Sequence, residues 1–223
     1  YETPSEGSIA GKTGTIGDLI AGTTYQLLVR SVDLYNNKSP DGRSVRITAN
    51  DVYADLPLPA PLANGEKLFD GFVPSASTGN LVINAIDNDS ITPKLATGTV
   101  TGISVVPGTA IRLMWKIPVQ YLVAGKTVYP YGVDGSVSTQ TAGVGFDAYV
   151  YAVDSRYNPT TVSDRTIRIT SDDPFYPSIG NFTMTGGTAT ITAITFRTAS
   201  PRKLIATDLT GSPTLNPATS VDI

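Results

Sequence analysis

The sequence contains no cysteine and no histidine. The absence of cysteine excludes disulfides and thiolate metal sites, so cysteine pairing gives no information on the redox compartment. The absence of histidine excludes His-based catalytic triads, histidine metal ligands and the side chain that most often moves protons near neutral pH.

Glutamate is scarce as well, because it occurs only at Glu2, Glu6 and Glu66. Glycosidases need two carboxyl groups at a fixed separation of roughly 5 to 10 Å, and none of these three residues lies in a recognisable motif. Most aspartates fall at predicted strand ends and turns, where bonding to the local backbone explains them. We therefore predict that the chain is not an enzyme.

Positive charge and long apolar runs are also missing. The formal net charge is -3 and the sequence pI is near 4.9. No stripe of Lys and Arg is available to neutralise phosphates, so we predict no nucleic-acid partner. No apolar run approaches the roughly 20 residues of a spanning helix, so we predict that the chain does not span a membrane. No signal peptide begins the chain, and we expect a mature or excised piece of a longer product.

Glycine, proline, threonine and valine are abundant, with 21 glycines and 16 prolines among 223 residues. Because β-branched side chains favour strands over helices, this composition predicts many short strands joined by turns. A hydrophobic content of 40% is sufficient for one large or two ordinary domains. The sequence therefore predicts an all-β fold.

The chain is an internal duplication. Residues 21–37 match residues 142–158 without a gap, and each copy leads from a glycine turn into a run of alternating apolar residues. This period of two predicts a strand with one face on a core. The predicted inward residues are Tyr25, Leu27 and Val29 in the first copy and Phe146, Ala148 and Val150 in the second. A later strand of the second copy alternates threonines with Ala189, Ile191 and Ala193, which we expect to face inward.

The match continues through most of both copies. Residues 1–4 align with 115–118, residues 46–48 with 168–170, and residues 101–105 with 219–223. The second copy carries seven extra residues within 128–141, which we interpret as a loop. Each copy has about seven strand-like runs, the number expected of a two-sheet sandwich with Greek-key connections. We predict one domain over residues 1–105 and a second over 106–223.

Several segments of the second copy resemble strands of the Ig-like repeats of bacterial and archaeal surface proteins, including invasin- and intimin-type adhesins. These segments are Val106–Leu113, Val123–Thr127, Ala152–Pro159, Ile169–Pro174 and Ile205–Asp208. Residues 22–33 are also similar to fibronectin type III domains.

The resemblance implies two tandem Ig-like Greek-key β-sandwiches in an extracellular or cell-surface protein. The implied role is structural, as a filament subunit, S-layer subunit or stalk, and the implied partners are copies of itself or neighbouring Ig-like modules. The alternatives are an adhesin or glycan-binding module, or an ancillary domain of a secreted carbohydrate-active enzyme.

The first copy lacks the first strand of the second. Residues 110–114 precede Trp115, whereas nothing in the sequence precedes the matching Tyr1. Two interpretations stay open: the sequence is cut from a longer repeat array, or a neighbouring subunit supplies the strand, since an open sheet edge is a template for strand addition. The residues predicted to form the strand-exchange edge are Ile9, Thr13, Val221 and Ile223.

Acidic loops offer hard oxygen ligands for calcium, although turn-forming aspartates have the same sequence signature. The calcium candidates are Asp87, Asp89, Asp172 and Asp173, and no other cofactor is predicted.

Aromatic residues in predicted loops either contact a partner or cover the end of a sandwich. The candidates for partner binding are Tyr129, Tyr131, Phe175 and Tyr176. N-x-S/T sequons, which are compatible with a glycosylated surface protein, occur at Asn37, Asn88 and Asn181.

Overall fold

The computed structural model describes residues 2–223, and Tyr1, which the duplication aligns with Trp115, lies outside the described residues. The described residues form strands, turns and loops without any helix, which confirms the all-β prediction. Accordingly, this part of the chain offers no helix long and apolar enough to cross a bilayer. The chain divides into two compact units, Tyr1–Val106 (unit 1) and Pro107–Ile223 (unit 2).

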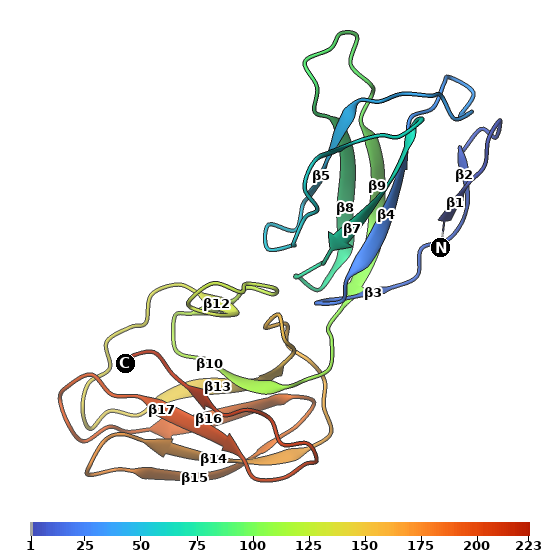
Figure 1. Ribbon diagram of the computed structural model, residues 1–223. Coiled ribbons are helices and arrows are strands. Elements are labelled where there is room, and N and C mark those ends of the chain that lie inside the picture. Colours follow the sequence, from blue (N-terminus) through green and yellow to red (C-terminus); the bar gives the residue numbers. More distant parts are fainter. Residues whose placement is uncertain (1) are drawn as a thin grey trace. The chain divides into compact units, whose positions relative to one another are not determined.

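Unit 1 contains two sheets and a hairpin (Figure 1). Its strands are β1 (Glu2–Pro4), β2 (Lys12–Gly14), β3 (Leu19–Ile20), β4 (Tyr25–Arg30), β5 (Ser44–Ala49), β6 (Ala60–Pro61), β7 (Glu66–Phe72), β8 (Thr78–Asp87) and β9 (Gly98–Val106). The larger sheet has the order β3-β9-β8-β5-β6, in which β3 runs parallel to β9 and the other pairs are antiparallel. Antiparallel β4 and β7 form the second sheet, and β1 pairs with β2.

The two sheets of unit 1 pack face to face. Buried Ile47 of β5 and Leu81 of β8 share one hydrophobic core with buried Phe69 and Phe72 of β7. The predicted inward residues of β4, Tyr25, Leu27 and Val29, pack against this core but stay partly exposed.

Unit 2 repeats this plan, but its sheet that matches β4–β7 has three strands. Its strands are β10 (Arg112–Lys116), β11 (Tyr121–Leu122), β12 (Val133–Asp134), β13 (Phe146–Val153), β14 (Arg165–Ser171), β15 (Ser178–Met184), β16 (Thr188–Ile194), β17 (Leu204–Asp208) and β18 (Ala218–Thr219). One sheet has the order β10-β13-β16 and the other β15-β14-β17-β18, while β11 pairs with β12, which lies within the predicted loop.

The core of unit 2 lies between these two sheets. Trp115 of β10 and Val150 of β13 share one buried cluster with Ile169 of β14 and Leu204 of β17. Phe146, Ala148 and Val150 are all buried, as their alternation predicts.

The prediction that Ala193 faces inward is wrong. The pairing of β13 with β16 shifts register between Phe146 and Ala148, and Ala193 bulges out at φ +55° and is exposed. The extra bulge residue returns Ile194 to the core, where it is fully buried. Gly71 takes the corresponding place in unit 1, with φ +88°, so the same bulge recurs there on a residue that accommodates it without strain.

Candidate functional site

The outer edge of β4 in unit 1 is the candidate site, because it lacks a strand that its duplicate in unit 2 has. Among the strands of residues 2–223, β4 pairs only with β7. Its duplicate β13 pairs with β16 on one side and with β10 on the other. Within residues 2–223, the edge that β10 covers in unit 2 therefore has no partner strand in unit 1.

The register of β10 in unit 2 shows which side chains and hydrogen bonds lie at this edge when a strand covers it. Leu113 lies opposite Ala152 and Trp115 opposite Val150, and both β10 side chains point into the core. Just before β10, the Ile111 backbone N–H donates to the Val153 carbonyl at 3.0 Å, and the Gly108 N–H donates to the Asp154 carboxylate at 2.8 Å.

Side-chain burial differs between the two units at matched positions. Val153 is fully buried against Met114 of β10 and Val133 of β12, whereas the matched Val32 is 45% exposed. Asp154 is fully buried, whereas the matched Asp33 is exposed. The residue types are identical at these two matched positions, so the cover provided by the segment around β10 explains the contrast.

The β1–β2 hairpin lies near this edge without pairing to it. The Asn36 side-chain amide donates to the Ser8 carbonyl at 2.9 Å, and Arg30 of β4 forms a long ion pair with Glu6 at 3.8 Å. In unit 2 the β11–β12 hairpin packs onto β10, because Val133 contacts Met114. An unpaired strand edge presents a row of backbone donors and acceptors, and its chemistry is to accept another strand.

The four residues predicted to form the strand-exchange edge lie elsewhere. Ile9 is fully exposed in the turn between β1 and β2, and Thr13 of β2 is opposite Thr3. Ile223 exchanges two backbone hydrogen bonds with Arg202 and packs against the core of unit 2, and Val221 is partly buried. The duplication indicates the missing strand, but only the pairing in space places the open edge at β4.

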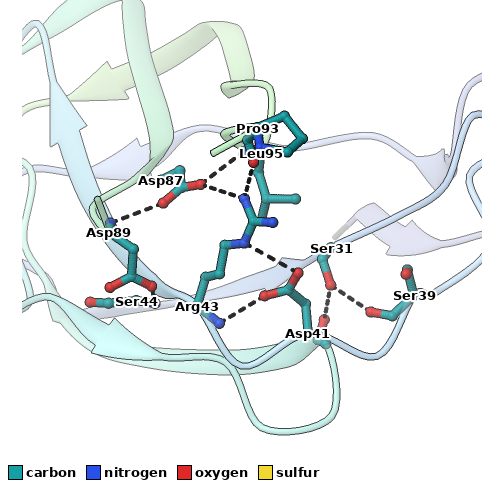
Figure 2. A network of polar contacts seen from close by, with 10 residues as sticks. Ser31, Ser39, Asp41, Arg43, Ser44, Asp87, Asp89, Pro93 and Leu95 are labelled. Carbon is teal, nitrogen blue, oxygen red and sulfur yellow. Dashed lines mark hydrogen bonds and ion pairs between the residues drawn. The ribbon is translucent and has the colours of Figure 1, made fainter. Parts of the chain in front are cut away.

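The calcium candidates of unit 1 bind protein donors (Figure 2). The Asp87 carboxylate accepts bonds from the Arg43 guanidinium and the Leu95 and Asp89 backbone N–H groups, and Asp89 accepts from the Ser44 N–H at 2.7 Å. Bonds from backbone N–H groups, followed by the Arg43 side chain and charge, lower the pKa of Asp87 against the opposing effect of burial.

The candidates of unit 2 are bonded in the same manner. Asp173 accepts hydrogen bonds from the backbone N–H groups of Phe175, Arg197 and Thr198, and Asp172 accepts one from the backbone N–H of Lys203. Burial raises the pKa of Asp173, but its backbone donors outweigh that effect and lower the pKa to about 2. Within residues 2–223, no group of three or more acidic side chains is arranged to hold a metal ion.

These aspartates belong to a set, repeated in both units, whose carboxylates accept hydrogen bonds from backbone N–H groups of loops. The sequence did not lead us to predict this set. Asp51 accepts from the Ser75 and Ala76 N–H groups, as Asp173 does from Arg197 and Thr198. Asp208 accepts from Arg165 and the Leu215 N–H, as Asp87 does from Arg43 and Leu95. The sequence did contain a signal for this set, because the aspartates stand at matched positions in both copies, each in a turn at the end of a strand.

The tyrosines of the unit 2 loop form a stack. Tyr131 lies parallel to Tyr157 with ring centroids 5.0 Å apart, and Tyr129 meets Tyr131 edge-on at 6.0 Å. The Arg112 guanidinium lies 4.7 Å from the centre of the Tyr157 ring. Tyr129 is 69% exposed, and the cluster borders a cavity of about 310 Å³ that Trp115 and Thr219 also line.

The remaining predicted positions are at the surface. Phe175 is exposed, and Tyr176 is half-buried under the Arg197 guanidinium, 5.4 Å from the ring centre. The sequon residues Asn37, Asn88 and Asn181 are all exposed.

Comparison with known proteins gives no family. No family model matches the chain, and no curated protein matches it. A glycosyl hydrolase family 2 member from Bacteroides cellulosilyticus is similar to 81% of this chain and 21% of its own, at 8% identity and TM-score 0.34. Apo β-glucuronidase 3 of Bacteroides uniformis matches over 91% and 25%, at 10% identity and TM-score 0.33.

The S-layer protein SbsC, domains 5–6, matches 94% of this chain and 93% of its own, at 17% identity and TM-score 0.29. The chain thus spans only about a quarter of the two glycosidase chains. All of these likenesses are too distant to assign a function.

Proposed function

We propose that the chain is a non-enzymatic structural segment of an extracellular or cell-surface assembly, built from two Ig-like modules, the first of which is completed by an added strand. The three-plus-four strand arrangement of unit 2, β10-β13-β16 against β15-β14-β17-β18, supports the Ig-like assignment. The absence of histidine and cysteine and the scarcity of glutamate support a role without catalysis.

One observation carries the proposal: among residues 2–223, no strand pairs with the edge of β4 where the edge of its duplicate β13 holds β10. A long open edge is a liability in a protein that acts alone, because it pairs with any available strand. In a modular assembly the same edge is the place where the next element is joined, since main-chain bonds and alternate side chains both contribute to the joint.

Pulling on single molecules tests this role. The wild-type chain is compared with a variant in which a copy of residues 107–114 is fused in front of Tyr1, supplying in cis the equivalent of the segment that leads into β10. We expect two separate unfolding events for the wild-type chain, with unit 1 yielding at the lower force. The fused segment should raise the force for unit 1 and leave unit 2 unchanged. Equal forces for both wild-type units, or no effect of the added segment, would contradict the proposal.

Ligand binding by the tyrosine loop is a second candidate, favoured by the exposed Tyr129 beside a cavity. Rings stacked on one another leave fewer free faces for a sugar, so we rank ligand binding by this loop below the structural role. A glycan array probed with the wild-type chain and with a Tyr129→Ala, Tyr131→Ala variant decides the matter. Signal that disappears in the variant supports binding, and an array without signal removes this candidate.

A further inference from the structure

Two consecutive edge strands of unit 2 carry no charge. β15 ends one sheet and β16 ends the other, and Figure 1 shows β15 as the outermost strand of its sheet. Residues 174–196, which contain both strands, include no Asp, Glu, Lys or Arg, although 16% of the chain is charged. Because charged side chains and prolines usually keep edge strands from pairing with other molecules, these two edges lack the usual protection.

Unit 1 provides an internal comparison. β7, which pairs with β4 as β16 pairs with β13, carries Glu66, Lys67 and Asp70. β6, which holds the place of β15 in the other sheet, contains Pro61, and Pro59 directly precedes the strand. Charge and proline therefore protect the edges of unit 1 that correspond to the uncharged edges of unit 2.

The backbone of β15 has groups that point outward. Thr183 lies opposite Thr166 of β14, and the Thr166 carbonyl accepts the Leu209 N–H, which follows β17. Thr166 thus directs its backbone groups away from β15, so Thr183 directs its own away from β14, because opposite residues of an antiparallel pair share one hydrogen-bonding state. Asn181, two residues earlier, points its groups the same way. No other strand of residues 2–223 pairs with this side of β15.

We propose that the β15 edge binds the β15 edge of a second copy of this chain, as an antiparallel pair with Phe182 opposite Phe182 of the second copy. In this register Asn181 lies opposite Thr183 of the second copy, and their outward N–H and C=O groups form hydrogen-bonded pairs. The contact uses the same surface on both molecules, as a two-fold dimer requires. The inference goes beyond the proposed function, because it does not involve the β4 edge.

Phe182 favours this register. Its side chain packs against the core of unit 2 but is only partly buried. Opposite residues whose backbone groups point away from each other bring their side chains closest, so the two Phe182 rings would lie against each other. An aromatic pair contributes beyond the area that it buries.

The neighbouring edge of β16 is less suitable. Ala193 bulges at φ +55°, and its N–H donates to the Asp147 carboxylate at 2.9 Å. A bulge twists an edge away from flat pairing, whereas β15 pairs regularly with β14 from Gly180 to Met184.

A second copy is the occupant because the β15 edge is complementary to itself. Polar Asn181 meets polar Thr183, one ring meets another, and β15 brings no charge to the contact. Arg168 of β14 lies opposite Asn181. The two Arg168 residues of a dimer would be about 14 Å apart, at three strand spacings of about 4.8 Å, and salt largely screens charges at that distance.

Sedimentation of the 223-residue chain, without a glycan at the Asn181 sequon, tests the inference. We expect a dimer with a Kd on the order of 10 to 100 µM, because an edge contact is small for a protein interface. The Asn181 and Thr183 amides should exchange more slowly at high than at low protein concentration.

Charge substitutions test the surface and the register. Asn181→Lys with Thr183→Lys places lysines opposite each other in the dimer, and Asn181→Glu with Thr183→Glu places glutamates there. Each double variant alone should dimerise at least about tenfold more weakly, whereas an equimolar mixture should form a one-to-one dimer, because opposite charges then meet. The matched control, Thr190→Lys with Thr192→Lys, puts the same charges on exposed positions of β16 and should leave the dimer unchanged.

The outcomes separate this inference from the proposed function. A chain that stays monomeric at about 1 mM, or a dimer that the lysines at 181 and 183 do not weaken, would overturn the inference. A mixture of the two variants that stays monomeric would overturn the stated register. The variant with residues 107–114 fused in front of Tyr1 should dimerise like the wild-type chain, and loss of its dimer would identify the β4 edge as the contact instead of β15.

Discussion

The exposure of Val32 makes the open edge measurable by a matched pair of substitutions. Val153→Ala in unit 2 removes two methyl groups from a fully buried site, and Val32→Ala removes them from a site that is already 45% exposed. At about 0.8 kcal/mol per buried methylene plus a cavity contribution, we expect a loss of about 2 kcal/mol at Val153 and about 1 kcal/mol at Val32.

The assay is native-state hydrogen exchange, which reads the free energy of unfolding of each unit from its own slowest amides. A double variant adds the control: with residues 107–114 fused in front of Tyr1, a methionine equivalent to Met114 is supplied to cover Val32. The cost of Val32→Ala should then rise toward the Val153 value. Equal costs at the two valines without the added segment would refute the argument that Val32 lacks cover.

Two further predictions concern features shared by the units. Ala193→Gly should stabilise unit 2 by about 0.5 to 1 kcal/mol in urea unfolding, because alanine is strained at positive φ, and Gly71→Ala should destabilise unit 1 similarly. A Cβ at Gly71 would meet no atom within 4 Å, so a loss there measures backbone strain alone, and an unchanged stability of unit 1 would contradict the strain argument. Asp173 has a folded-state pKa of about 2 against an ordinary 3.8, so its contribution is present above pH 3.8 and is lost as the pH falls toward 2. Asp173→Asn should therefore lower the thermal midpoint at neutral pH and flatten its fall between about pH 4 and pH 2, and an unchanged acid profile would contradict that role.

Much of the fold could be predicted from the alternation of apolar and polar residues and from the internal duplication. Period-two patterns identified β4 and β13 and their inward residues, since side-chain facing is a local consequence of strand geometry. Ala193 escaped this reasoning because a bulge inserts one residue and reverses the alternation after it. The short hairpins β1–β2 and β11–β12 also escaped it, because their two- or three-residue strands are too short to show a period.

The candidate site was harder to place than the fold. The duplication gives residues 110–114 no counterpart within the sequence, but it does not show which surface such a segment would cover. That surface is set by long-range pairing of β4 with β7. Likewise, the sequence alone did not show that Asp173 accepts hydrogen bonds from the backbone of residues 197 and 198, because these lie on a distant loop.

Hydrogen exchange along β4 and β13 tests the central claim most directly. In the wild-type chain, the β4 amides that point away from β7 should exchange faster than the matched β13 amides, which face β10, by about 100-fold or more. Fusing residues 107–114 in front of Tyr1 should slow the β4 amides and leave β13 unchanged. Equal protection of the two strands in the wild-type chain would contradict an open edge at β4.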